Sequence, residues 1–374
     1  MPFFGIIKYI ILLNLFKIIC TSLYISFAQQ NMTQIEFGHK LDFNNVLIRP
    51  KRSTIKSRSE VSLERDFKFK YSSNRWNGVP IMASNMDSTG TFEVYKVLST
   101  YNMLTMLHKF YTINDYIAHK DILDPNLFGV STGISDNDFT NLISIMEVID
   151  CNWICVDIAN GYLNGMVEYC KRVRSQFPDK IIIAGNVVTR EIVEELILVG
   201  GVDIVKIGIG PGSACTTRLK TGVGMPQLSA ILECSDAAHG VGGHIISDGG
   251  ITCPGDMSKA FGGGADFVMV GGQFAGHDEN PGEIIEENGK QMKIFYGMSS
   301  EKAQEKYYGA MAKYRSSEGR VLKIPYKGSL HNTVGDFLGG LRSTCTYINA
   351  SCVKHMSKCT TFMQVHQQLN SSFL

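Results

Sequence analysis

The sequence lacks the cysteine spacing of a zinc-binding or disulfide-stapled protein. Its ten cysteines are scattered along 374 residues, and the closest two, Cys151 and Cys155, have no second pair to complement them. Structural zinc sites usually draw on two such pairs, so no zinc site is expected. Scattered cysteines suit a reducing compartment, and this favours a cytoplasmic location.

Long blocks of charge of one sign are also missing. The 36 Lys and Arg residues are interspersed with 35 Asp and Glu residues, and the net charge is +1. Proteins that follow a nucleic-acid backbone present a basic surface, so nucleic acid is not expected as a partner. With 44% hydrophobic and 19% charged residues, the chain is expected to fold as one large domain or two smaller ones.

One long apolar run stands near the start of the chain, at residues 3–28. It is long enough for a signal peptide or membrane anchor, but Lys8 and Lys17 interrupt it and Met32 follows soon after. Three interpretations stay open: an upstream extension with a wrong start codon, a targeting segment, or an interfacial helix. We therefore divide the chain into a hydrophobic extension, residues 1–31, and a domain, residues 32–374. Membrane contact is expected only if the extension is real.

Eight short apolar runs recur from residue 80 onward, each followed by a segment with helical character. Runs that are apolar throughout are typical of a parallel sheet that is covered on both faces. The amphipathic pattern of residues 190–200 predicts one of the helices that would cover it. Eight repeats predict a (β/α)8 TIM barrel. A doubly wound sheet is the alternative, but residues 83–92 after the first run contain no GxGxxG fingerprint. The runs are residues 80–86, 104–110, 127–133, 153–160, 181–188, 202–210, 244–251 and 267–274.

Glycines gather where the last three of these strands are expected to end. Gly249, Gly250, Gly271 and Gly272 would lie beside Ser213, and glycine lets backbone N–H groups approach an anion closely. The pattern indicates a phosphate site, with tight barrel turns as the alternative for any single glycine. The neighbouring Asp248 is suited to accept two ribose hydroxyls, or else caps a turn.

Cys215 lies in the polar loop "GIGPGSACTTR", residues 208–218, after the sixth strand. A structural cysteine usually has apolar neighbours, whereas this thiol is flanked by glycine, serine and threonine. Backbone N–H groups or Arg218 would favour the thiolate there. The residues alone leave two interpretations open: a nucleophile, or a redox-inert loop residue.

These motifs resemble the family of IMP dehydrogenases and GMP reductases. The resemblance covers nearly everything after Met32, and its cysteine loop is highly specific. Three features of the sequence favour the reductases of the eukaryotic type over the dehydrogenases. The chain has no room for the regulatory nucleotide-binding repeats that dehydrogenases usually insert, and its loop reads C-T-T-R where dehydrogenases read C-I-T. Residues 314–320 and 343–350 are also similar to reductase segments. The matching segments are residues 41–61, 84–87, 185–189, 208–218, 247–251, 267–272 and 295–300.

The resemblance implies reductive deamination of GMP to IMP with NADPH, releasing ammonia, as part of purine interconversion and salvage. Cys215 would attack C2 of the guanine ring and form a covalent thioimidate. Thr217 and Glu318 would deliver the proton to the leaving nitrogen. Without the resemblance, Glu318 reads as a solvated charge in a loop.

The family also implies binding residues, a monovalent cation and a homotetramer in which the cofactor touches a neighbouring subunit. GMP would be bound by Ser213, Asp248, Gly249, Gly250, Gly271, Gly272, Gly297, Met298, Ser299, Arg315 and Gly319. NADPH would be bound by Ser57, Arg58, Lys109, Asp157, Ile158, Ala159, Ile209, Gly210, Met298, Tyr314, Arg315, Ser343, Thr344, Cys345 and Thr346. Potassium would be held by carbonyl oxygens of Gly210, Gly212, Cys215 and Arg218.

Two rival readings of the sequence differ from this expectation. One is an IMP dehydrogenase that lacks its regulatory insert, reduces NAD and hydrolyses the thioimidate. The other is a nucleotide-binding barrel that has lost catalysis. Every matched chemical residue is present, and this favours an active enzyme.

Overall fold

The computed structural model describes residues 35–314 and 316–366. The expected extension at residues 1–31 and the expected ligand-binding residue Arg315 therefore lie outside the described residues. The chain divides into a unit of Met1–His39 and a unit of Lys40–Leu374, and the helices and strands of the described residues all belong to the second unit. Within the described part, none of the helices combines the length and apolarity needed to cross a bilayer.

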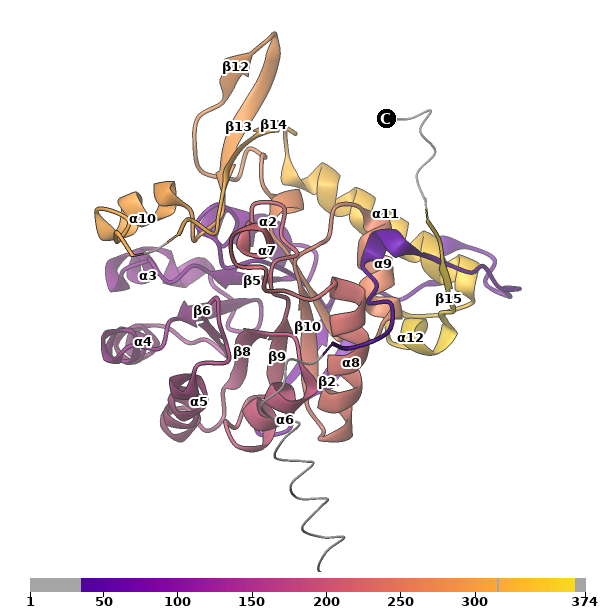
Figure 1. The fold of residues 1–374 in the computed structure, drawn as a ribbon, viewed down its shortest axis with the longest axis horizontal. Coiled ribbons are helices and arrows are strands. Elements are labelled where there is room, and N and C mark those ends of the chain that lie inside the picture. Colours follow the sequence, from indigo (N-terminus) through magenta and orange to yellow (C-terminus); the bar gives the residue numbers. More distant parts are fainter. Residues whose placement is uncertain (1–34, 315, 367–374) are drawn as a thin grey trace, which may run out of the picture. The chain divides into compact units, whose positions relative to one another are not determined.

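Eight parallel strands close into a barrel in the order β10-β11-β4-β5-β6-β7-β8-β9. Each of the eight apolar runs contains one of them, so the predicted TIM barrel is confirmed (Figure 1). Nearly all of their residues are buried because the strands are covered by side chains on both faces. The strands are β4 (Ile81–Ala83), β5 (Leu104–Leu107), β6 (Phe128–Thr132), β7 (Trp153–Asp157), β8 (Ile181–Val187), β9 (Ile204–Ile207), β10 (His244–Asp248) and β11 (Phe267–Val270).

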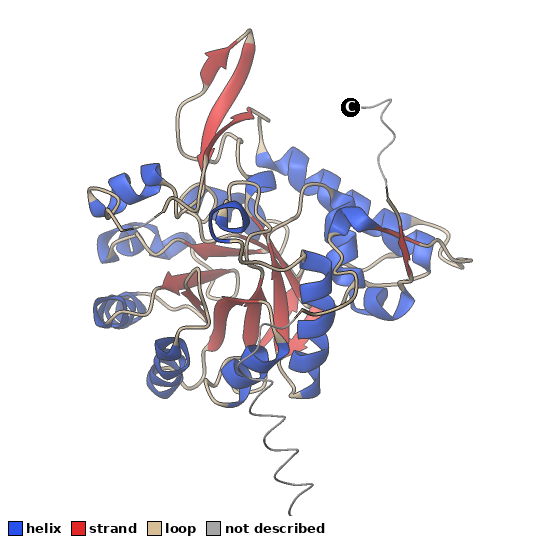
Figure 2. Cartoon of the chain, in the orientation of Figure 1, coloured by secondary structure: helices blue, strands red, loops and turns tan. Residues whose placement is uncertain are grey.

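Helices surround the barrel, as the secondary-structure colouring of Figure 2 makes plain. The predicted helix at residues 190–200 is α6, which buries Val193, Leu196 and Ile197 at helical spacing. Capping boxes start α3 and α4, where Thr112 and Ser135 pair with aspartates three residues later. The covering helices are α2 (Phe92–Ser99), α3 (Ile113–His119), α4 (Asp136–Val148), α5 (Asn164–Gln176), α6 (Arg190–Leu198), α8 (Gln227–Gly240), α9 (Pro254–Gly262) and α11 (Leu330–Ile348).

Further elements lie outside the strand and helix repeats. A three-stranded antiparallel sheet, β12-β13-β14, projects beyond the barrel in Figure 1, and β1 pairs with β15 near the end of the described chain. The strands are β1 (Val46–Ile48), β12 (Ile285–Glu287), β13 (Lys290–Tyr296), β14 (Val321–Pro325) and β15 (Phe362–Gln364). The short helices are α7 (Thr217–Thr221), α10 (Glu301–Tyr308) and α12 (Met356–Cys359). Single 3₁₀ turns are η1 (Phe43–Asn45), η2 (Arg58–Glu60), η3 (Lys120–Ile122), η4 (Gly272–Phe274) and η5 (Val353–His355).

A hairpin of β2 (Arg65–Lys68) and β3 (Arg75–Gly78) covers the N-terminal end of the barrel. Phe67 stacks on Phe267, with ring centres 4.3 Å apart, and Trp76 meets Trp153 edge-on at 5.6 Å. Phe267 and Trp153 are the first residues of β11 and β7, so these rings fill the N-terminal mouth of the barrel. Large aromatic surfaces buried in this way contribute strongly to stability.

An ion network lies at the same end of the barrel. Asp266 accepts from Arg65 at 2.8 Å and pairs with His239 at 2.7 Å, and His244 Nδ1 lies 3.4 Å from it. Among the described residues this is the one cluster with metal-ligand side chains at short range. The Arg65 guanidinium already neutralises the carboxylate, so we interpret the cluster as a structural ion pair.

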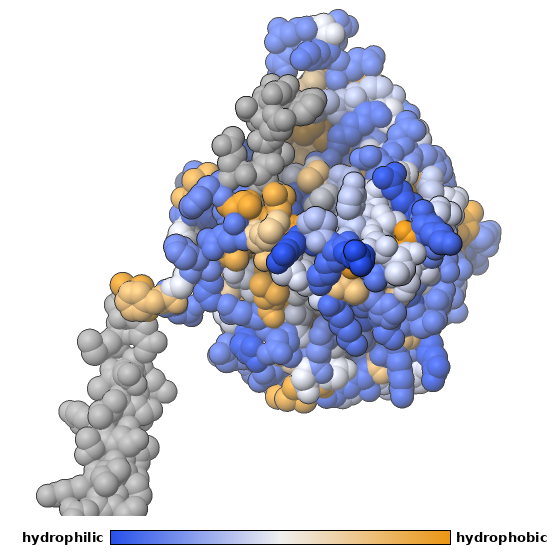
Figure 3. Space-filling view, turned by 90° about the vertical axis from the view of Figure 1, so that its right-hand side faces the viewer, coloured by the Kyte–Doolittle hydropathy of each residue, from blue (hydrophilic) through white to orange (hydrophobic). Residues whose placement is uncertain are grey.

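The face shown in Figure 3 is largely hydrophilic, with apolar residues visible as patches among charged and polar ones. The interior of the protein has the opposite composition: Ile81, Phe128 and Ile246 are completely buried. This division is typical of a globular chain whose apolar residues are taken up by its core.

Candidate active site

Cys215 lies in the loop between β9 and α7, at the C-terminal end of the barrel strands. Its side chain is half-buried, and its N–H donates to the carbonyl of Gly212 at 3.0 Å. A β-bridge joins Cys215 to Gly319, and the N–H of Thr216 donates to the carbonyl of Glu318 at 2.8 Å. The segment around Glu318 therefore holds the cysteine loop in place from one side.

The three predicted catalytic residues form one chain of hydrogen bonds. The Cys215 thiol donates to the Thr217 hydroxyl at 3.3 Å, and this hydroxyl donates to Glu318 Oε2 at 2.8 Å. Thr217 is the first residue of α7, and Thr216 is the residue at the N-cap position. A proton can move along such a chain from the thiol to the carboxylate, so the arrangement can generate a thiolate nucleophile.

The predicted phosphate residues come together beside this loop. A Cβ added to Gly272 would lie 2.8 Å from Ser213 Oγ, and one added to Gly249 would lie 2.9 Å from the Pro211 ring. Gly249 also has a φ of 89°, which favours glycine. Gly250 and Gly271 flank these positions at the ends of β10 and β11. The backbone at these glycines thus lies close to the cysteine loop, and its N–H groups carry no side chain that would keep a phosphate away.

A turn after β13 completes this side of the site. Gly297 donates its N–H to the carbonyl of Arg320 at 3.2 Å, and Arg320 donates its N–H to the carbonyl of Ala214 at 2.9 Å. A Cβ on Gly319 would come within 2.7 Å of the Ser300 nitrogen, so this crossing needs glycine. The predicted residues Gly297 and Gly319 therefore lie against the cysteine loop, and Met298 and Ser299 follow Gly297 in the same turn.

Asp248 ends β10, and its carboxylate is oriented by two donors. Asn186 Nδ2 donates to Asp248 Oδ2 at 2.8 Å, and the Lys206 ammonium lies 3.3 Å from the same oxygen. Among the described residues Oδ1 accepts no hydrogen bond, so it remains available for a hydroxyl donor. This geometry suits the ribose-binding role predicted for Asp248.

Lys206 and Asn186 are site residues that the sequence analysis missed. Lys206 lies in the middle of β9, is 2% exposed at its side chain, and reaches Asp157 Oδ1 at 2.5 Å. A lysine inside an otherwise apolar strand was the available signal, since buried lysines are rare unless paired. Its partners could not be named in advance because they come from other strands.

The predicted cofactor residues fall into two groups. One group lies at the strand ends or in the segment after β13: Lys109, Asp157, Ile158, Ala159, Ile209, Gly210, Met298 and the exposed Tyr314. The other lies in the outer layer, where η2 contacts α11: Ser57, Arg58, Ser343, Thr344, Cys345 and Thr346.

Two members of the outer group point their side chains into the protein. Cys345 is completely buried, and burial raises the pKa of its thiol to about 12. The Thr344 hydroxyl lies 2.9 Å from the hydroxyl of Ser258 on α9. A ligand on this part of α11 would therefore meet Ser343 and Thr346, whose side chains are half-exposed.

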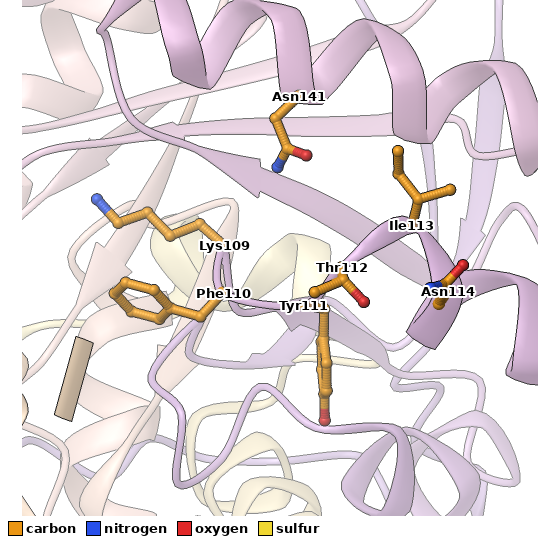
Figure 4. Close-up of a pocket in the computed structure, with 7 residues that line it drawn as sticks. All are labelled: Lys109, Phe110, Tyr111, Thr112, Ile113, Asn114 and Asn141. Atoms are coloured by element: carbon orange, nitrogen blue, oxygen red, sulfur yellow. The ribbon is translucent and has the colours of Figure 1, made fainter. Parts of the chain in front are cut away.

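A hollow lies beside Lys109, between the loop after β5 and α4 (Figure 4). The Lys109 side chain extends along one edge of it, and Asn141 of α4 faces it from the other side. None of its lining residues belongs to the cysteine loop. It lies next to Lys109, which is predicted to bind the cofactor. The lining residues are Lys109, Phe110, Tyr111, Thr112, Ile113, Asn114 and Asn141.

The four predicted potassium ligands lie on one loop and the first turn of α7. The carbonyls of Gly212 and Arg218 accept N–H groups of Cys215 and Gly222, and each carbonyl keeps a second lone pair. The Arg218 guanidinium is directed to Asp42 at 3.3 Å and to the Met225 carbonyl at 2.5 Å. The donor set is thus neutral oxygen with a compensated neighbouring charge, which fits a monovalent cation.

Asp87 anchors the segment that follows β13. Its Oδ2 accepts from Tyr296 and Tyr307, each at 2.6 Å, and from Lys306 at 2.7 Å. Burial would raise the pKa of this carboxyl, but these three donors outweigh burial and lower it. Tyr307 also stacks on Phe110 with ring centres 3.5 Å apart. This clasp holds α10 against the loop that carries Lys109.

Comparison with known proteins gives consistent results for sequence and structure. The model of the IMP dehydrogenase / GMP reductase domain matches residues 40–371. A GMP reductase of Vibrio parahaemolyticus is 57% identical over 344 residues, covering 91% of this chain and 99% of the relative. A GMP reductase of Ascaris suum is 53% identical over 348 residues, covering 91% and 98%.

A solved structure shares the fold. It is a GMP reductase from Trypanosoma brucei in complex with guanosine 5'-monophosphate, 24% identical in sequence, with a TM-score of 0.80. The alignment covers 88% of this chain and 96% of that chain. Because the family model spans most of the sequence and relatives are more than half identical over nearly their whole length, this protein belongs to the IMP dehydrogenase and GMP reductase family.

Proposed function

We propose that the chain reduces GMP to IMP and ammonia with NADPH, and so serves purine nucleotide interconversion and salvage. The observation that carries this proposal is the hydrogen-bonded chain from Cys215 through Thr217 to Glu318. The relatives named GMP reductase support the same reaction. A carboxylate linked to the nucleophile through a hydroxyl is what the removal of an amino group requires, because nitrogen must be protonated to leave.

In the first half of the reaction, Cys215 forms a bond from Sγ to C2 of the guanine ring. The thiol proton passes by way of Thr217 to Glu318 and returns by the same route to the exocyclic nitrogen. The C2–N bond then breaks, ammonia leaves, and C2 remains bound to sulfur as a thioimidate. Splitting the substitution into these steps lowers the barrier for displacing a poor leaving group.

In the second half, the carbon–sulfur bond is released. When bound, NADPH supplies the hydride that reduces C2. Cys215 then departs as a thiolate, IMP is released, and the thiol is restored by a proton. Asp248 would hold the ribose hydroxyls during both halves, while Ser213 and the glycines at the ends of β10 and β11 hold the phosphate.

A potassium ion at the carbonyls of Gly210, Gly212, Cys215 and Arg218 would stabilise the conformation of the cysteine loop. We also propose a homotetramer. The separation of the cofactor residues into a strand-end group and an outer group on η2 and α11 supports a cofactor bound between two copies of the chain.

The test is an absorbance assay with purified protein. Loss of NADPH absorbance that depends on GMP, with equimolar IMP and ammonia formed, is the expected result. A gain of NADH absorbance that depends on IMP would instead assign the chain to the dehydrogenases. Binding of GMP with neither signal would indicate a barrel that binds nucleotide without turnover.

A further inference from the structure

One buried ammonium contacts residues at the ends of three other barrel strands. Lys206 on β9 lies 2.5 Å from Asp157 Oδ1 at the end of β7, and 3.3 Å from Asp248 Oδ2 at the end of β10. Asn85, which follows β4, offers its side-chain oxygen at 3.4 Å. The ammonium therefore stands between a residue assigned to the substrate and a residue assigned to the cofactor.

Lys206 is the cation that both carboxylates of this cluster contact. Burial alone would lower the pKa of the lysine, but Asp157 and Asp248 outweigh burial and raise it, so the ammonium stays charged. Burial would likewise raise the pKa of Asp157, and Lys206 outweighs it and lowers that pKa. Two carboxylates thus share one cation, and at 2.5 and 3.3 Å they compete for it.

Competition for one cation provides a physical link between ligands. A substrate hydroxyl that donates to Asp248 satisfies part of its hydrogen-bonding capacity and weakens its hold on the ammonium. The ammonium is then freer to fix Asp157, which lies where the cofactor is expected. Asn85 and Asn186 also lie at this cluster, but their amides carry no charge and cannot replace the ammonium of Lys206.

We propose that Lys206 is a positioning residue that couples the two ligand sites, so that a nucleotide on Asp248 strengthens binding of the cofactor next to Asp157. This inference rests on the proposed function, since it takes Asp248 as the ribose ligand and Asp157 as a cofactor ligand. Coupling of this kind is reciprocal and falls in the range of about 5-fold to 150-fold in affinity. Lys206 itself touches neither reacting atom.

The experiment measures binding without turnover in the full-length protein. IMP and NADPH form an unreactive pair, because C2 of IMP already carries the hydrogen that the reaction adds. NADPH is titrated calorimetrically into the protein with and without saturating IMP, and the ratio of the two dissociation constants gives the coupling. In the unmodified protein IMP should tighten NADPH binding by at least about 5-fold.

Lys206→Met should bring this ratio close to one. Because this variant leaves two carboxylates without a cation, a second variant combines Lys206→Met with Asp157→Asn and restores the original net charge of the cluster. Lys293→Met is the matched control, since Lys293 is also buried but donates to the carbonyls of His277 and Asn280. The control should keep the coupling even if its melting temperature falls.

The outcomes separate the role of Lys206 from the proposed function. Loss of coupling in a folded Lys206 variant, with coupling kept in Lys293→Met, supports the proposal. Coupling that persists in either Lys206 variant, or is missing from the unmodified protein, overturns it. The GMP-dependent oxidation of NADPH by the unmodified protein is measured separately, so an active enzyme without coupling refutes only the role of Lys206.

Discussion

Glu318 accepts a 2.8 Å hydrogen bond from the hydroxyl of Thr217, although Thr217 starts α7 and Glu318 lies 101 residues later, in the segment before β14. Because this carboxylate is proposed to move a proton and not to bind nucleotide, Glu318→Gln should lower kcat by about 100-fold or more and leave the dissociation constant of GMP nearly unchanged. Steady-state kinetics and calorimetry measure the two quantities. Glu305→Gln, an exposed change on α10, is the control, and unchanged kcat in Glu318→Gln would remove Glu318 from the mechanism.

Cys215→Ala should abolish turnover and leave GMP binding in place, because the side chain supplies the bond to C2. Acid-quenched mixtures of the unmodified protein with GMP should show, by intact mass spectrometry, a fraction carrying nucleotide. Cys253→Ala removes an exposed thiol that has no role in the proposed reaction and should still show the adduct. Turnover in the Cys215 variant would contradict covalent catalysis.

Gly272→Ala tests the proposed phosphate site at Ser213 and the glycines that follow β10 and β11. The new methyl group would lie 2.8 Å from Ser213 Oγ, which must move or clash. We expect the KM for GMP to rise by about 10-fold, a loss typical of one hydrogen bond to a charged group. Gly335→Ala on α11 meets no atom within 4 Å and serves as the control. Equal KM values for the two variants would place the phosphate elsewhere.

Asp87→Asn tests the clasp on α10. The amide loses the charge that attracts Lys306 and cannot accept equally from both tyrosines, so stability should fall by about 2 kcal/mol. Urea unfolding measures this loss. The KM for NADPH should also rise, because α10 is held against the loop that carries Lys109. A stability loss without any kinetic change would limit the clasp to a structural role.

His239 predicts a pH dependence of stability. Its hydrogen bond to Asp266 raises its pKa above the ordinary value of 6.5. The protonated imidazole therefore stabilises the fold fully below about pH 6.5, and this contribution disappears as the pH rises through the raised value. His239→Gln should lower the free energy of unfolding at about pH 6 but have little effect at about pH 9. Equal losses at both pH values, in urea titrations, would contradict this assignment.

The sequence predicted the barrel because each buried parallel strand leaves a short run that is apolar throughout. All eight runs contain a strand, and the helix expected at residues 190–200 is α6. The hairpin of β2 and β3 was not predicted. Its strands bury only alternate residues and span four positions each, so the pattern is too short to detect.

Site residues that belong to a local sequence motif could be predicted from the sequence. Site residues that are brought together only by folding could not. The loop around Cys215 identifies itself by composition, and the resemblance named Thr217 and Glu318. Lys206 was not predicted, and Asp87 was matched only as part of residues 84–87 without a role, because their partners lie on strands and helices distant in sequence. Electrostatic pairs of this kind are created by the closure of the barrel and leave no local pattern.

The packed rings of Phe67, Trp76, Trp153 and Phe267 close the N-terminal end of the barrel. In the proposed reaction the nucleotide would therefore reach Cys215 from the opposite, C-terminal end of the barrel, where the loop after β9 lies. Substitutions among these aromatic residues would therefore change the thermal stability of the barrel without altering the residues proposed for the chemistry at its C-terminal end.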